Sequence, residues 1–142
     1  MSGFSPKFPL QFNESAGAYV NNTTLKEVIK QNFKNLLLTN PGERVMNAKF
    51  GVGLRRYFFE PMTNTVQSDI SAKISSKTSK YMPFVTINDI GFNSDGTNDN
   101  LLAITISYSI IPLREVDTMV IAKDSPTIEK EKSRWLKIQA KK

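Results

Sequence analysis

The feature that most constrains the fold is the segment 102–110, in which apolar residues alternate with small polar ones. Such alternation is typical of a strand with one buried face. A second apolar segment, 84–92, precedes it, and residues 93–100 between the two are Asn, Ser, Asp, Gly and Thr, which favour turns. The two segments predict an antiparallel hairpin. Residues 116–122 predict a third strand added to the same sheet.

Two helices are predicted before the hairpin. Thr24 and Glu27 have the spacing of a capping box, in which the Thr hydroxyl accepts from the third helical amide and the Glu carboxylate reaches back. Apolar residues then recur at helical spacing until an Asn-Pro-Gly sequence, which predicts a helix over about 24–39. A similar stripe predicts a second helix over about 65–81. The fold class is therefore α+β, with two main helices and a small antiparallel or mixed sheet.

The chain divides into three parts. Residues 1–22 combine prolines and glycines with scattered phenylalanines, which indicates an extended arm that lies either on its own domain or on a neighbouring subunit. Residues 23–122 form the domain. Residues 123–142 are a basic extension, predicted to be helical, which carries much of the net charge of +6.

Composition excludes several classes of function. The chain contains no cysteine and no histidine, which removes disulfides, Cys/His zinc sites and His-based catalytic pairs. We predict no metal site, no cofactor and no small-molecule substrate. The N-terminus lacks a secretion signal and no apolar run is long enough for a membrane span, so we expect synthesis and retention in a cytoplasm without membrane association.

The glycine-rich segment 41–61 contains two carboxylates, Glu43 and Glu60. A carboxylate pair is what glycoside hydrolysis requires. However, Arg44, Arg55 and Arg56 lie beside these residues and would lower the carboxyl pKa values, whereas an acid catalyst needs a raised one. We therefore predict ion pairs that hold the segment in shape.

Three other patterns favour ordinary structure over chemistry. Gly51 and Gly53 could begin a dinucleotide-binding loop, but that pattern needs a third glycine where Arg56 stands, so they indicate a tight loop. Residues 95–99 lack the spacing of a calcium loop and indicate a turn. The basic extension with Trp135 could contact nucleic acid, although a partner-docking helix is the better interpretation because the rest of the chain is nearly neutral.

Residues 36–61 join a helix end, a Pro-Gly-Glu-Arg turn, a Phe-Gly-x-Gly-Leu loop and a Phe-Glu-Pro stop. This order resembles the W-protein-like baseplate wedge family of contractile phage tails, which includes the sheath-like T-even wedge protein and TssE of type VI secretion. The positions that carry the resemblance are Pro41, Gly42, Glu43, Arg44, Phe50, Gly51, Gly53, Leu54, Phe59, Glu60 and Pro61. We expect apolar side chains from Leu54 to Phe59 to be buried in the fold.

The resemblance implies a fold like the core of the tail-sheath subunit and a structural, non-enzymatic role in the tail baseplate of a virion. The protein would link the wedge to the sheath base and template the first sheath ring, in six copies. Its partners would be other wedge subunits, the sheath protein, and tube-initiating or hub proteins. Nucleic acid is not an expected partner. A lysozyme-like tail enzyme and a nucleic-acid-binding protein are the alternatives.

One departure from the family pattern concerns the partner contact. The family usually carries Glu-Pro-Arg at the end of the second helix, and this chain has Met82, Pro83 and Phe84 there. The resemblance then implies an apolar wedge contact. A strand edge near 116–122 would accept a partner strand, so the predicted interface residues are Met82, Pro83, Phe84, Val116, Met119, Ile121 and Trp135.

Overall fold

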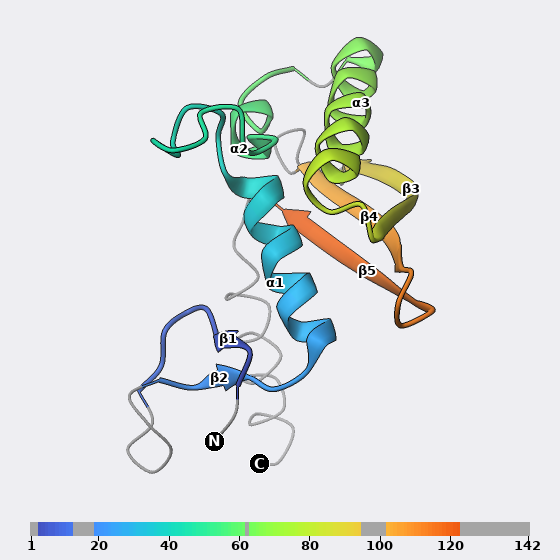
Figure 1. Cartoon of the computed structure of the whole chain (residues 1–142). Helices are drawn as coiled ribbons and strands as arrows, with labels where there is room; N and C mark the ends of the chain where they lie inside the picture. The colour runs from blue at the N-terminus through green and yellow to red at the C-terminus, as the bar shows by residue number, and fades with distance from the viewer. Residues whose placement is uncertain (1–2, 13–18, 62, 95–101, 123–142) are drawn as a thin grey trace, which may run out of the picture.

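The computed structural model describes residues 3–12, 19–61, 63–94 and 102–122 (Figure 1). Trp135 and the whole predicted C-terminal helix, like the central part of the predicted turn, lie outside these residues. The elements are β1 (Ser5–Pro6), β2 (Asn21–Asn22), α1 (Leu25–Leu38), α2 (Leu54–Tyr57), α3 (Asn64–Tyr81), β3 (Val85–Ser94), β4 (Leu102–Ile110) and β5 (Glu115–Ala122). The predicted α+β class is confirmed.

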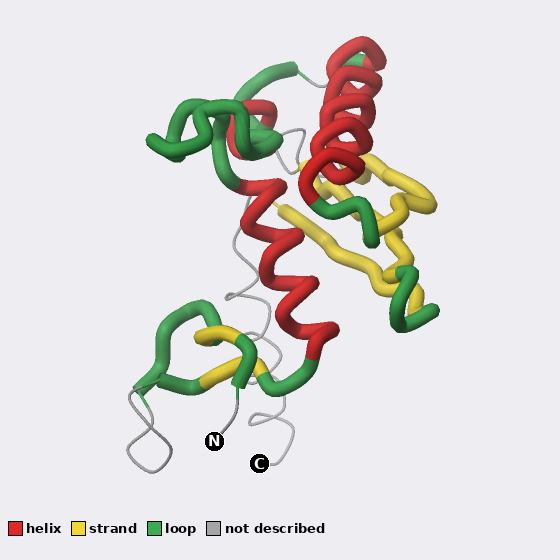
Figure 2. Tube along the Cα trace, in the orientation of Figure 1, coloured by secondary structure: helices red, strands yellow, loops and turns green. Residues whose placement is uncertain are grey.

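The main sheet has the order β3-β4-β5, with both pairings antiparallel, so β5 is an edge strand. The predicted hairpin and third strand are therefore confirmed. Tyr108 on β4 lies opposite Asp117 on β5, and a register shift interrupts the β3 pairing between Ile87 and Asp89. In Figure 2 this sheet lies beside α1 and α3, while the small β1-β2 sheet lies at the N-terminal end of α1.

Both long helices begin as the sequence predicts. The amide of Glu27 donates to the Thr24 hydroxyl (3.3 Å), and the Glu27 carboxylate accepts from the amides of Thr23 and Thr24, which completes the capping box of α1. These hydrogen bonds hold the pKa of Glu27 below its ordinary value. The hydroxyl of Thr63 accepts from the amide of Val66 at the start of α3.

The core lies between the helices and one face of the sheet. Phe33 of α1 and Tyr108 of β4 are fully buried, with their ring centroids 4.8 Å apart. Leu54 of α2 and Ile70 of α3 are also fully buried in the same cluster. A two-layer arrangement of helices on a sheet is the ordinary way to bury one face of each element. The candidate interaction surfaces lie near the two ends of α1.

Candidate functional site

The family-like segment forms a rigid loop at the C-terminal end of α1. Gly51 has φ +99°, and a Cβ atom at this position would stand 2.1 Å from the carbonyl oxygen of Thr39. Gly53 has φ +75° and precedes α2. The amide of Val52 donates to the carbonyl of Leu36 (3.0 Å), which ties the loop to α1. The prediction that these glycines permit a tight loop is confirmed.

The charged side chains of the loop do not form the predicted ion pairs. The Glu43 carboxylate accepts from the backbone amide of Asn40 (3.0 Å) and from its side-chain amide (2.8 Å). The guanidinium of Arg44 lies over the Phe50 ring, 4.4 Å from its centroid. Among the described residues, the ion pairs are elsewhere, and none includes Glu60. The sequence prediction was wrong because neighbours in the chain need not face each other.

Beside the loop lies an open groove of about 640 Å³, which we call the loop groove. Glu43 and Arg44 of the Pro-Gly-Glu-Arg turn line one part of it. Met82 and Phe84, which stand where the family usually carries Glu-Pro-Arg, line another part. Glu60 is not among the lining residues, so the two candidate carboxylates do not share this groove. The residues that line it are Asn32, Asn35, Leu36, Thr39, Glu43, Arg44, Phe50, Tyr81, Met82 and Phe84.

The exposed apolar side chains around the loop groove differ from those expected. Met82 is only 6% exposed and belongs to the core, whereas Pro83 and Phe84 are exposed. Phe59, which we expected to be buried, is 80% exposed, because it follows the short helix α2 whose inward positions are Leu54 and Tyr57. Two further apolar residues of the loop, Val45 and Met46, are 95% and 99% exposed.

A second groove, of about 570 Å³, lies near the N-terminal end of α1, and we call it the arm groove. Its walls are the N-terminal arm, α1 and residues 118–120 of β5. It therefore borders the edge strand of the main sheet. The lining residues are Lys7, Phe8, Pro9, Asn22, Glu27, Lys30, Gln31, Lys34, Asn35, Thr118, Met119 and Val120.

The side chains of β5 alternate between the core and the surface. Met119 and Ile121, two predicted interface residues, are 5% and 6% exposed and pack in the core. Val116 and Val120 are 66% and 57% exposed. Successive side chains of a strand point to opposite faces, so this two-residue period in the sequence could have identified Val120 as a surface residue.

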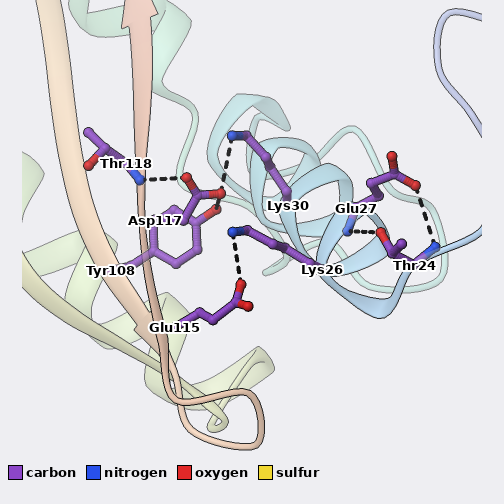
Figure 3. A network of polar contacts seen from close by, with 8 residues as sticks. All are labelled: Thr24, Lys26, Glu27, Lys30, Tyr108, Glu115, Asp117 and Thr118. Atoms are coloured by element: carbon purple, nitrogen blue, oxygen red, sulfur yellow. Dashed lines mark hydrogen bonds and ion pairs between the residues drawn. The ribbon is translucent and has the colours of Figure 1, made fainter.

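Asp117 is the centre of a polar network that joins β5 to α1 (Figure 3). Its carboxylate accepts from Lys30 Nζ (3.1 Å), from the Tyr108 hydroxyl (3.3 Å) and from the backbone amide of Thr118 (2.9 Å). Burial raises the pKa of the Asp117 carboxyl, but the hydrogen bonds from Lys30 and Thr118 and the charges of Lys30 and Lys26 outweigh it and hold the pKa below its ordinary value. No local pattern in the sequence indicates this contact between residues 87 positions apart.

Two groups near Asp117, the Tyr108 hydroxyl and the Lys26 ammonium, have raised pKa values. Burial, together with the Asp117 charge, raises the pKa of the Tyr108 hydroxyl, so this group stays protonated and donates. A second ion pair joins Lys26 Nζ to Glu115 Oε2 at 2.8 Å, and the hydrogen bond and charge of Glu115 raise the pKa of Lys26. The N-terminal half of α1 is therefore fastened to β5 by two lysines one turn apart.

The N-terminal arm is fastened to α1 by one side chain. The Gln31 carboxamide accepts from the Phe8 amide (3.0 Å) and from Asn22 Nδ2 (3.0 Å), and it donates to the Pro6 carbonyl (2.9 Å). The described part of the arm thus contacts its own domain, the first of the two predicted possibilities. Its aromatic residues remain exposed: Phe4 69%, Phe8 57% and Phe12 80%.

Two other kinds of site are absent from the described ranges. No group of three or more acidic, histidine or cysteine side chains there is arranged to hold a metal ion. No described helix combines the length and apolar character needed to cross a bilayer.

Two solved structures are similar in fold. One is a protein from Geobacter sulfurreducens with a provisional tail-lysozyme name (TM-score 0.62, 21% identity, 75% of this chain and 98% of that chain). The other is a chain of the anti-feeding prophage baseplate (TM-score 0.55, 19% identity, 87% of this chain and 90% of that chain). At these identities the likeness concerns the fold. No curated protein matches the sequence closely enough to count as a relative.

The sequence itself matches the family described as "Baseplate wedge protein gp25" over residues 23–112. The match includes α1, the loop with its glycines, α3, β3 and β4, whereas β5 follows it. It covers well over half of the 142 residues and contains the loop groove's main walls. The chain therefore belongs to this family of structural baseplate wedge proteins.

Proposed function

We propose that the protein is a non-enzymatic wedge component that links the baseplate wedge of a contractile tail to the base of the sheath and templates the first sheath ring. The observation that carries the proposal is the edge strand β5, which borders the arm groove in a chain of the baseplate wedge family. The site of action would be the tail baseplate of a virion, after synthesis in the host cytoplasm. Six copies and a sheath-like core are part of the proposal.

The edge of β5 suits the addition of a partner strand. A strand at the edge of a sheet presents unpaired backbone groups on alternate residues. The amide of Thr118 donates to the Asp117 carboxylate (2.9 Å), a side-chain acceptor that an added strand would have to displace. Strand addition draws its affinity from main-chain hydrogen bonds, so it needs little from side chains. A terminal arm of the sheath protein is the proposed added strand.

The loop groove is the proposed contact with the other wedge subunits. Phe84 lines it, and Val45 and Met46 project almost fully exposed from the adjoining loop. Exposed apolar groups gathered in one place are typical of an interaction site. Because the charged residues of the family's Glu-Pro-Arg are absent here, the contact should tolerate high salt. Tube-initiating or hub proteins would contact the assembled wedge.

The enzyme alternative has little support in the geometry. Glu43 is held by Asn40, while Glu60 lies outside the loop groove. A hydrolase would lose activity in Glu43→Gln or Glu60→Gln, and we expect no peptidoglycan clearing by the unmodified protein. The nucleic-acid alternative rests on residues 125–142, outside the described part of the chain, and would appear as salt-dependent retention on DNA.

The test is co-expression with the wedge and sheath proteins of the same locus, followed by size-exclusion chromatography with mass determination. Thr118→Pro removes one edge amide, and Thr118→Ala is its matched control because it retains that amide. We expect Thr118→Pro to lose the sheath protein and keep the wedge subunits. Phe84→Asp should do the reverse.

Thermal unfolding of each variant would first establish that it is folded. A protein that stays monomeric with every partner would overturn the assembly role. Full sheath binding by folded Thr118→Pro would overturn strand addition at β5 and leave the wedge contact standing.

A further inference from the structure

We infer that the arm groove receives an extended segment whose side chains are acidic on the face that meets α1. This inference deepens the proposed function, because it rests on the addition of a strand to β5. It names the chemistry of the strand, which main-chain pairing alone leaves open.

The position of the groove fixes what an added strand would meet. Paired strands lie about 4.8 Å apart, so a strand on the free edge of β5 would run beside Thr118 and Val120 and enter the arm groove. The same groove is lined by the α1 residues Lys30 and Lys34 and by the arm residue Lys7. The added strand would therefore pass close to three lysines.

The charges of this lining are unequal. Three lysines and one glutamate line the groove. The glutamate, Glu27, is engaged by the capping amides of α1, and its pKa is lowered in part by the nearby charge of Lys7. Lys30 is paired with Asp117. Within the described residues neither Lys7 nor Lys34 has an ion-pair partner, and since Lys7 lies near the charge of Glu27, Lys34 is the cation most available to a ligand.

The groove also has an apolar side. Phe8 and Val120 are each 57% exposed, and Pro9 is next to Phe8. Because alternate side chains of a strand point in opposite directions, one strand can present acidic groups to the lysines and apolar groups to these residues. The expected occupant thus alternates acidic and apolar residues.

The chain's own continuation fits this chemistry poorly. Residues 123–142 follow β5 directly, but they contain seven basic and three acidic residues. Basic side chains brought close to the lysines of the groove would repel them. Charge complementarity therefore favours a segment from a partner over residues 123–142.

The experiment uses the full chain and three ten-residue fluorescent peptides that alternate Val with Glu, with Thr or with Lys. Fluorescence anisotropy measures their affinities at low and high salt. We expect the Glu peptide to bind about tenfold more tightly than the Thr peptide at low salt, with the Lys peptide weakest. Added salt should reduce the difference.

Two variants test whether the Glu peptide binds in the arm groove. Lys34→Glu should weaken binding of the Glu peptide about fivefold or more. Lys49→Glu makes the same charge change on the exposed loop at the other end of α1 and should have little effect. Equal weakening by both variants would indicate general attraction and overturn the inference.

The acidic preference and the strand addition itself can be overturned separately. If the Thr and Glu peptides bind equally and Thr118→Pro abolishes both, strand addition stands and the acidic preference is overturned. If binding is unaffected by Thr118→Pro in a folded protein, strand addition itself is overturned.

Discussion

The two ends of α1 are held in different ways. At the C-terminal end, the loop is fixed by glycines in the left-handed region, by the buried side chain of Leu54 and by a backbone bond to Leu36. At the N-terminal end, β5 and the arm are attached by Asp117, Gln31 and other polar side chains. The loop is therefore part of the core's stability, whereas the arm end can adjust to a partner at small cost.

The strongest test of this difference is Gly51→Ala. The new Cβ atom would lie 2.1 Å from the Thr39 carbonyl oxygen, at a φ of +99° that side chains rarely adopt. The loop must move for this residue to fit. We expect the free energy of unfolding to fall by about 3 kcal/mol or more, measured by urea denaturation.

Gly42→Ala is the matched control for Gly51→Ala. Gly42 has nearly the same φ, +98°, but a Cβ atom there would meet nothing within 4 Å. The expected loss is about 1 kcal/mol, from backbone strain alone. Equal losses in the two variants would show that the loop does not press against α1, and the contrast between the two ends would fail.

The next test removes a charge at the other end, through Asp117→Asn. Asp117 is paired with Lys30 in a position where its side chain is only 19% exposed. We expect a loss of about 1 kcal/mol in the free energy of unfolding near pH 7, less than for Gly51→Ala because solvent screens part of the interaction.

The pH dependence of this loss has a definite sign. The folded-state pKa of Asp117 lies below its ordinary value of 3.8. Its contribution is therefore present above pH 3.8 and is lost as the pH falls through the folded-state pKa. The gap between the native protein and Asp117→Asn should close in this acidic range. A gap that instead widened with acidification would contradict the assignment.

The features that the sequence could predict are local ones. The capping box of Thr24 and Glu27, the glycine loop and the strand alternation are all local patterns, and each appears in the structure as expected. They are determined by residues within a few positions of one another, which is the range over which propensity and spacing act.

The contacts that the sequence did not reveal join distant segments. Lys30 meets Asp117 only because α1 packs over β5, and Glu43 bonds to Asn40 while its neighbour Arg44 turns to Phe50. Charge adjacency in the sequence carries no information about such directions. The alternation of β5 identifies its exposed positions, and Met119, a predicted interface residue, lies at a buried one.

A smaller global effect is expected from Gln31→Ala. This change removes all three hydrogen bonds that the carboxamide makes to the arm and to Asn22. Because the arm's aromatic side chains are largely exposed, the free energy of unfolding should change by less than about 1 kcal/mol. Hydrogen exchange of the Phe8 amide should accelerate strongly, while amides in β4 stay unchanged. Unchanged exchange at Phe8 would show that other contacts hold the arm.

The smallest effect is expected at the exposed pair of Lys26 and Glu115. Their nitrogen and oxygen are only 2.8 Å apart, yet the side chains are 42% and 47% exposed, so water and salt screen the attraction. Lys26→Met should leave the melting temperature at pH 7 nearly unchanged. The raised pKa of Lys26 means that any contribution is present below its ordinary value of 10.5 and is lost as the pH rises through the folded-state pKa.

A large loss of stability at neutral pH would show that the arm end of α1 depends on surface ion pairs. A negligible loss would leave Asp117 as the principal polar attachment of β5 to α1.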